Sequence, residues 1–201
     1  MAEPTRRLFF ALWPDEPSRA ALVHATHKAV RHSGGRPVAE HNLHTTLLFL
    51  GSVTESRVSE VMTIGARAAA ETLVARAGSS LPSSFVFDRI ELWQKAHVLV
   101  ATTSAATGDG HLLANALVGS LQRETSSAGF GPDLKPFRPH VTLARKVAFL
   151  KTVLRTEPVE WRFAEFALVE SRTDPDGPVY TVLHSYPLES RGGGNRTGRG
   201  T

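Results

Sequence analysis

The sequence has no cysteine among its 201 residues, which excludes disulfides, thiolate nucleophiles and cysteine-ligated zinc sites. It also lacks any apolar run near the roughly 20 residues that a helix needs to cross a bilayer. The first ten residues carry too few apolar side chains for the core of a signal peptide. The lack of a membrane span and of a signal-peptide core predicts a cytoplasmic protein that does not associate with membranes, whereas the lack of cysteine does not constrain the redox compartment.

Positive charge is only slightly in excess. Lys and Arg number 23 against 19 for Asp and Glu, which gives a net charge of +4 with histidine neutral. Three of the arginines lie in residues 190–201, a Gly/Arg-rich segment with no apolar residue to bury, which we predict to be a disordered tail. Without them the chain is close to neutral, so an anionic ligand would need a local site.

The remaining residues alternate between strand-like and helix-like patterns. Apolar and β-branched runs predict strands over 7–12, 41–51, 85–93, 97–101, 137–145, 161–171 and 178–187. Helical spacing of apolar residues predicts helices from about Ser18, after a cap at Thr54, and from Asp109. Hairpins and short connections favour a mostly antiparallel α+β fold, and no linker divides the chain.

One short pattern occurs twice. Leu43-His44-Thr45-Thr46-Leu47 and Pro139-His140-Val141-Thr142-Leu143 share histidine, any residue, threonine and leucine. The two histidines lie about half the chain apart. Side chains alternate faces along a strand, so each histidine points to the same side as the threonine two residues later, with Cα atoms roughly 6.5 Å apart. Two such strands side by side would line one cleft with two imidazoles and two hydroxyls.

This set of side chains suits phosphodiester hydrolysis. The hydroxyls of Thr46 and Thr142 can donate hydrogen bonds to the non-bridging oxygens of a phosphate. The imidazoles of His44 and His140 can remove a proton from water and give one to the leaving oxygen near neutral pH. The residues alone do not say which histidine is the acid and which is the base.

Two other readings of single residues are weaker. His41 and His44 would ligate a metal together only on a helix, whereas this stretch reads as a strand and no carboxylate cluster completes the site. We therefore predict no metal and no cofactor. Phe9, Phe10 and Trp93 are candidates for stacking on an RNA base, although packing in the core is the favoured interpretation.

The paired motifs resemble those of the 2H phosphoesterase superfamily, and specifically the bacterial RNA 2′,3′-cyclic phosphodiesterases, also called 2′-5′ RNA ligases. The resemblance covers roughly residues 6–188 and rests on the segments 7–11, 42–51 and 136–145. It implies a bilobal, pseudo-symmetric α+β fold in which two antiparallel sheets line a central cleft with helices outside. The corresponding domain would span residues 1–189 as two intertwined lobes.

The resemblance also implies roles. His44 would be the proton donor and His140 the proton acceptor, with Thr46 and Thr142 holding the phosphate. Arg145 matches the family segment and would offset charge on the phosphorus. Strict alternation places Arg145 opposite His140, however, so its participation requires a twist or a bulge in the strand.

The expected reaction opens a 2′,3′-cyclic phosphate at an RNA end to a 2′-phosphate, with weak 2′-5′ ligation as the reverse process. Two alternatives stay open. One is the same chemistry on a small cyclic nucleotide or an ADP-ribose cyclic phosphate. The other is a non-catalytic module that binds RNA ends, although binding alone needs no matched acid and base. We expect the protein to be a monomer.

Overall fold

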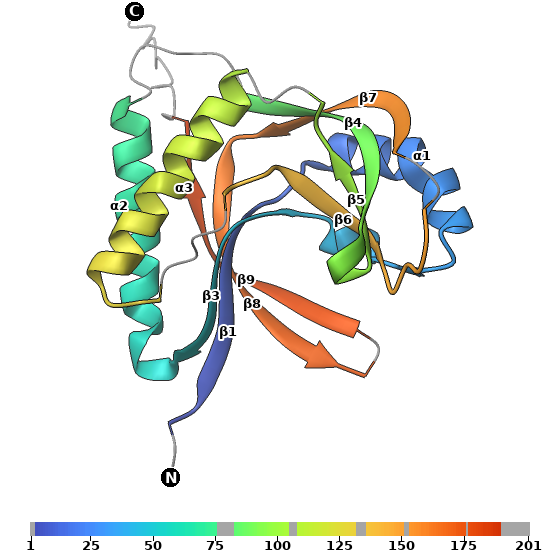
Figure 1. Cartoon of the computed structure of the whole chain (residues 1–201). Coiled ribbons are helices and arrows are strands. Elements are labelled where there is room, and N and C mark those ends of the chain that lie inside the picture. Colours follow the sequence, from blue (N-terminus) through green and yellow to red (C-terminus); the bar gives the residue numbers. More distant parts are fainter. Residues whose placement is uncertain are drawn as a thin grey trace, which may run out of the picture.

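Two antiparallel sheets organise the computed structural model, which describes residues 3–75, 83–104, 108–131, 136–150, 153–175 and 177–189 (Figure 1). The first sheet, sheet A, has the strand order β3-β1-β8-β9. These strands are Thr45–Thr54 (β3), Thr5–Leu12 (β1), Glu165–Asp174 (β8) and Gly177–Pro187 (β9). The predicted α+β class with antiparallel sheets is confirmed.

The second sheet, sheet B, has the order β2-β6-β5-β4-β7. Its strands are Arg36–Pro37 (β2), His140–Arg145 (β6), Val98–Thr102 (β5), Ser83–Trp93 (β4) and Leu154–Phe163 (β7). The hairpin expected from residues 85–101 is present, because β4 pairs with β5 in antiparallel register. The short strand β2, which adds to the edge of β6, was not predicted.

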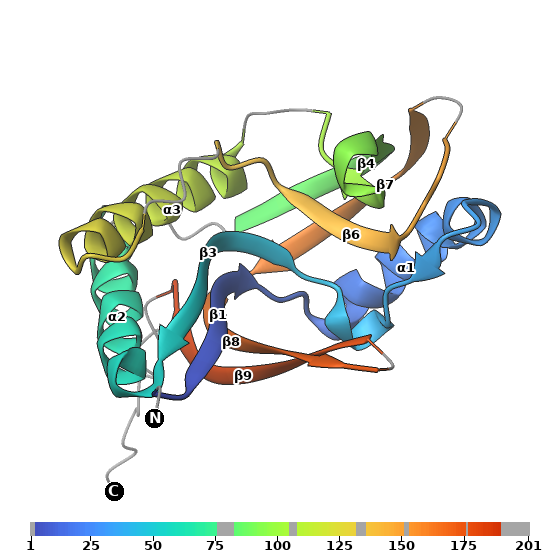
Figure 2. The same ribbon diagram turned by 60° about the horizontal axis from the view of Figure 1, so that its bottom comes forward.

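Three α-helices pack around the sheets: Glu16–His32 (α1), Val58–Ala75 (α2) and Asp109–Ser127 (α3). Asp15 caps α1 by accepting a hydrogen bond from the backbone N–H of Ser18 at 2.8 Å. Helices α2 and α3 lie side by side at one end of the molecule, and α1 lies against β7 at the other (Figures 1 and 2). No helix in the described part of the chain is long and apolar enough to cross a membrane.

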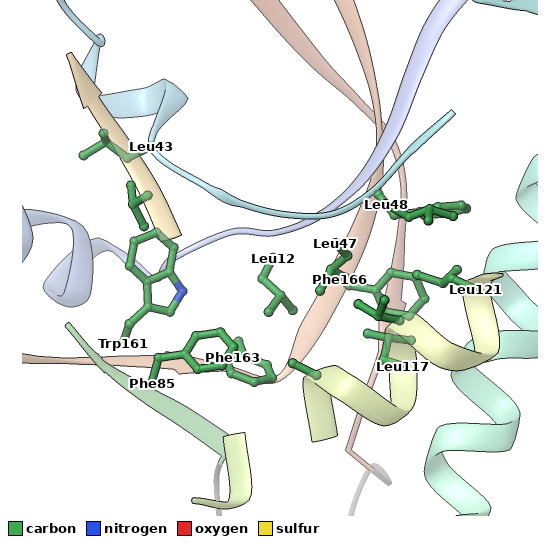
Figure 3. Close-up of a cluster of buried hydrophobic side chains, with 14 of the residues drawn as sticks. Leu12, Leu43, Leu47, Leu48, Phe85, Leu117, Leu121, Trp161, Phe163 and Phe166 are labelled. Carbon is green, nitrogen blue, oxygen red and sulfur yellow. The ribbon is translucent and has the colours of Figure 1, made fainter. Parts of the chain in front are cut away.

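One hydrophobic core joins the two sheets. Figure 3 shows Phe85, Trp161 and Phe163 of sheet B near Leu12 and Phe166 of sheet A, with further leucines from α3. All five of these side chains are almost fully buried. Because burial of such side chains is the main stabilising contribution in folding, the two sheets depend on each other for stability. Their relative position, and hence the geometry of anything between them, is fixed by this core.

Several expected boundaries were wrong. The single strand expected over 161–171 is two strands, because the chain leaves sheet B after Phe163 and enters sheet A at Glu165. The strand expected from residue 41 begins at Thr45, since a 3₁₀ turn (η1, Glu40–Asn42) precedes it.

The strand expected from residue 137 begins at His140, directly after a proline that has no N–H to give to a sheet. The side chain of Thr54 makes no capping hydrogen bond, because α2 is entered through a second 3₁₀ turn (η2, Glu55–Arg57). The predicted tail, residues 190–201, lies outside the described residues.

Candidate active site

The two histidines of the repeated motif come from different sheets. His140 is the first residue of β6 in sheet B, and His44 directly precedes β3 in sheet A. Although β3 and β6 do not pair in a sheet, they contact each other where the two sheets meet (Figure 2). The motifs therefore approach each other across the junction of the sheets rather than as neighbouring strands of one sheet.

The two imidazoles are held in the same way. Nδ1 of His44 lies 2.7 Å from the carbonyl oxygen of Asn42, and Nδ1 of His140 lies 2.8 Å from the carbonyl oxygen of Arg138. A carbonyl oxygen only accepts, so Nδ1 must carry the proton on each ring. The other nitrogen, Nε2, is left to exchange protons with a ligand. Each motif thus presents an imidazole whose orientation is fixed by a backbone carbonyl.

A cavity of about 430 Å³ brings most of the predicted site residues together. His44 and Thr46 line it from sheet A, and Thr142 and Arg145 line it from sheet B. His140 is not among the described residues that line this cavity, but it shares a strand face with Thr142. The cavity is also bounded by side chains that the sequence did not single out: Arg7, Phe49, Ser171, Thr173, Pro178 and Tyr180.

A β-bulge in β6 turns Arg145 towards the cavity. Val100 of β5 pairs with Thr142 and Leu99 pairs with Ala144, so Leu143 is an extra residue without a partner. The extra residue shifts the alternation by one, and Arg145 then lies on the same side as Thr142. Its Nη2 lies 3.5 Å from the hydroxyl of Tyr180 across the cavity. The bulge that the sequence required for participation of Arg145 is therefore present.

A bulge at Leu47 in β3 has a similar effect. Ala11 of β1 pairs with Thr46 and Phe10 pairs with Leu48, which leaves Leu47 as the extra residue. As a result Phe49 shares the cavity with Thr46 instead of facing the core. Phe49 is 40% exposed, and the guanidinium of Arg7 lies 5.2 Å from the centre of its ring.

Aromatic rings enclose His44. Its imidazole is stacked on the indole of Trp13, with ring centres 5.0 Å apart and planes 11° apart. Phe9 and Tyr180 contact it at 5.1 and 5.0 Å. Burial among these rings lowers the pKa of His44 to about 4, against a smaller upward effect of the hydrogen bond to the Asn42 carbonyl. In the free protein His44 is therefore neutral at neutral pH.

Nearby positive charge contributes to the same shift. Burial is the largest cause of this shift and the opposing Asn42 hydrogen bond the second. The positive charges of His140 and Arg145 have smaller effects, and both lower the pKa of His44 further. The two imidazoles therefore lie within electrostatic range of each other. A bound phosphate would act in the opposite direction, because negative charge favours the imidazolium form.

His140 has a different environment. Its ring lies 4.3 Å from that of Trp93, and burial lowers its pKa, opposed by the hydrogen bond to the Arg138 carbonyl and assisted by the charge of Arg138. The guanidinium of Arg138 pairs with Glu91, whose carboxylate also accepts from the hydroxyl of Thr102. A tryptophan thus packs on each histidine, as Trp13 does on His44.

The three aromatic residues considered for stacking on a base occupy different environments. Phe10 is fully buried in the main core, as expected for packing. Phe9 and Trp93 instead contact His44 and His140. No group of three or more histidines and carboxylates with metal-binding geometry occurs among the described residues.

Comparison with known proteins shows to which family the chain belongs. A family model described as the 2′-5′ RNA ligase superfamily matches residues 14–175. The chain belongs to the 2′-5′ RNA ligase superfamily. It is 37% identical to an RNA 2′,3′-cyclic phosphodiesterase of Thermus thermophilus over 93% of this chain and 92% of that protein. It is 29% identical to the protein of that name from Escherichia coli, over 94% of this chain and 99% of that protein.

Solved structures of the superfamily share the fold. Escherichia coli LigT complexed with 3′-AMP superposes with a TM-score of 0.75 at 24% identity, covering 93% of this chain and all of that one. TT0787 of Thermus thermophilus gives a TM-score of 0.68 at 33% identity, covering 92% of this chain and all of that one. The resemblance to the 2H phosphoesterases seen in the paired motifs is thereby confirmed.

Proposed function

We propose that this protein hydrolyses 2′,3′-cyclic phosphates at RNA 3′ ends to 2′-phosphates, with His140 as general base and His44 as general acid. The observation that carries the proposal is the cavity that unites His44, Thr46, Thr142 and Arg145 beside His140. The names of the relatives in the superfamily point to the same reaction. The assignment of acid and base follows the family resemblance.

The reaction needs two proton transfers. Nε2 of His140 takes a proton from water as the water oxygen bonds to phosphorus. The bond from phosphorus to O3′ breaks, and Nε2 of His44 gives its proton to O3′. Both transfers use the nitrogen that the backbone hydrogen bonds leave free. Turnover leaves the proton on His140, so exchange with solvent must reset the pair.

Hydrogen-bond donors at fixed positions would stabilise the negative charge on the phosphoryl oxygens. Thr46 and Thr142 present hydroxyls from the two sheets, and Arg145 presents a guanidinium from the end of β6. Such donors lower the barrier if they bind the pentacoordinate phosphorus more tightly than the ground state. Because each sheet supplies one hydroxyl, the phosphate would be held at the junction between them.

The cavity also has space and surface for the terminal nucleoside. Phe49 is an exposed aromatic ring in an otherwise mostly polar cavity, with Arg7 against it. Bases of single-stranded RNA are commonly bound by stacking on such rings. We expect the base of the cyclic nucleotide to lie on this side of the phosphate.

The same arrangement supports the reverse reaction. A 5′-hydroxyl can take the place of water beside His140, and its oxygen then bonds to phosphorus while the bond from phosphorus to O3′ breaks. His140 would again take the proton of the nucleophile and His44 would again protonate O3′ as it leaves, so that a 2′,3′-cyclic end and a 5′-hydroxyl end are joined by a 2′-5′ bond. Since water is present at far higher concentration, we expect ligation to be weak.

The test uses a short RNA with a 2′,3′-cyclic phosphate in the presence of excess EDTA. We expect ring opening to a 2′-phosphate, identified by chromatography against both phosphate isomers. A 3′-phosphate product would reverse the proposed leaving group. Loss of activity in EDTA, restored by zinc or manganese, would contradict a mechanism carried by the two histidines alone.

Three expectations from the sequence accompany this proposal. We expect the protein to act as a monomer in the cytoplasm. We also expect residues 1–189 to suffice for catalysis, because they hold the side chains that line the cavity in the described part of the chain. Deleting residues 190–201 should leave turnover of a dinucleotide cyclic phosphate unchanged. A loss of folding after this deletion would show that the tail belongs to the domain.

A further inference from the structure

A second cavity, of about 560 Å³, lies beyond Trp13 from the site described above. It is bounded by Trp13, by the segment in which the chain passes from β7 to β8, and by β9. The residues on which the argument rests are Trp13, Asp15, Arg162, Glu165, Val182 and Glu189. None of them belongs to the repeated motifs.

The two cavities share one face of sheet A. Phe9 and Val169 pair across β1 and β8, and with Ala11 and Ala167 they form a small buried cluster on this face. Phe9 lines the first cavity and Ala167 lines the second. On β9, Tyr180 belongs to the first cavity and Val182, two residues later on the same face, belongs to the second.

Trp13 stands between the two cavities. Its indole is stacked on His44, with ring centres 5.0 Å apart, and contacts the edge of Tyr180 at 6.4 Å. The same side chain lines the second cavity. The indole of Trp13 therefore separates His44, the proposed acid, from a second cavity that is large enough for a nucleotide base.

The proposed reaction fixes which part of an RNA lies near this wall. His44 protonates O3′ as it leaves, so the ribose that carries O3′ lies on the His44 side of the phosphorus. The preceding nucleotide is attached through the 5′ carbon of that ribose. The RNA chain can therefore continue from His44 past Trp13 along the shared face of sheet A.

The charges around the second cavity favour a base over a phosphate. Asp15, Glu165 and Glu189 contribute negative charge, against the single arginine, Arg162. That arginine is already paired with Glu160, at 2.9 Å. Carboxylates accept hydrogen bonds but donate none, and they repel phosphates. The amino groups of adenine, cytosine and guanine are suitable donors for them.

We infer that the second cavity binds the base of the nucleotide immediately preceding the cyclic end, stacked on Trp13 and bordered by the carboxylates. This inference rests on the proposed function, because that function orients the RNA. The protein would then bind the last two nucleotides of an RNA, and RNA ends would be better substrates than mononucleotide cyclic phosphates.

The test compares the binding of two dinucleotide 2′-phosphates by calorimetry. One is ApA with a terminal 2′-phosphate, and the other lacks only the base of the first nucleotide. We expect the complete dinucleotide to bind about tenfold more tightly, as for a base stacked on an aromatic ring. Adenosine 2′-phosphate, measured beside them, shows what the added phosphodiester contributes. Equal binding of the two dinucleotides would overturn the inference, and would assign any gain over the mononucleotide to the phosphodiester.

Two variants locate the effect. Trp13→Leu keeps an apolar side chain beside His44 but removes the stacking surface, and should reduce the ratio of the two affinities from about tenfold to about one. Val182→Glu replaces an apolar surface of the cavity by a longer, hydrated side chain in the space that the base would occupy, and should also reduce the ratio. Its matched control is Val179→Glu, because Val179 is on the opposite face of β9 with similar exposure, 41% against 48% for Val182.

The outcomes separate this inference from the proposed function. A tenfold ratio that persists in Trp13→Leu, or that falls equally in both valine variants, would overturn the second base site. A protein that shows the ratio but does not open cyclic phosphates would refute the proposed reaction alone. A protein that opens them but binds both dinucleotides equally would refute the inference alone.

Discussion

Glu91 lies 2.6 Å from the guanidinium of Arg138, and its side chain is only 14% exposed. The carbonyl oxygen of Arg138 accepts the Nδ1 hydrogen of His140. The same guanidinium lies 5.5 Å from the ring centre of Trp93, which packs on His140. The ion pair with Glu91 thus holds Arg138, whose carbonyl orients His140 and whose guanidinium lies near Trp93.

Glu91→Gln should therefore lower kcat by about tenfold or more, since small displacements of a catalytic group are costly. It should also move the optimum of the pH–rate profile to lower pH. The charge of Arg138 lowers the pKa of His140, and without Glu91 that charge is less compensated. Steady-state kinetics over a range of pH measure both effects.

The control is Glu55→Gln, which removes a carboxylate from an equally short ion pair with Arg6 outside the cavity. The side chain of Glu55 is 46% exposed, and ion pairs of exposed carboxylates contribute little. We expect unchanged kinetics. If Glu91→Gln behaved like this control, Glu91 would have no part in positioning His140.

Thr46→Val and Thr142→Val should each weaken stabilisation of the phosphoryl group by about 1–3 kcal/mol, or about 5- to 150-fold in kcat/KM. Valine preserves the shape of the side chain, so folding should be retained. The neighbouring Thr45 gives a matched control, because its hydroxyl is buried without a hydrogen-bond partner. Thr45→Val should leave kcat/KM unchanged and the stability unchanged or increased. Normal activity in Thr46→Val/Thr142→Val would mean that the hydroxyls do not face the phosphate.

Binding of a tetrahedral anion should be coupled to proton uptake. Burial lowers the pKa of His44 to about 4 in the free protein, and an anion beside it must raise that pKa. Between the two values, binding adds a proton to the protein, so affinity should weaken as pH rises. Sulfate is a suitable probe because it does not titrate in this range. Calorimetry at about pH 6 in buffers of different ionisation enthalpy counts the protons.

His44→Gln should abolish most of this uptake, and any remainder should be lost in the double variant His44→Gln/His140→Gln. Uptake that is unchanged in His44→Gln would assign the coupled proton to another group. Binding of sulfate with no proton uptake between about pH 5 and 7 would show that His44 is not protonated by a bound anion, and so could not act as the acid.

The local part of the site could be predicted from the sequence, and the long-range part could not. Alternation along a strand is a local property, so the spacing in each motif placed His140 and Thr142 on one face. The position of Arg145 depends on a bulge that is set by the register between β5 and β6. Nothing in residues 139–145 alone reveals that register.

Contacts from distant segments were missed for the same reason. Trp13 and Tyr180 lie far apart in the sequence, yet both contact His44. The change of sheet at Ala164 was also hidden, because the apolar pattern continues from β7 into β8. Periodicity reports which face of an element is buried but not which sheet the element joins.

The last prediction tests the pair of histidines. Catalysis requires His140 neutral and His44 protonated at once, so acidification and alkalinisation should both lower the rate. The pKa values of both are lowered in the free protein, that of His44 to about 4. The optimum of kcat/KM, which reports the free protein, should therefore lie below the ordinary histidine value of about 6.5. The optimum of kcat should lie at higher pH, because bound phosphate raises the pKa of His44.

His44→Ala and His140→Ala should each lower kcat by about 10²- to 10⁴-fold, the usual contribution of general acid or base catalysis. The double variant should lose little more, because the two groups act as a unit. His41→Ala is the control, since His41 is exposed in the turn before His44. Both limbs of the pH profile belong to the pair and not to either residue alone. A flat profile, or near-native turnover in either single variant, would refute two-histidine catalysis and favour a protein that only binds RNA ends.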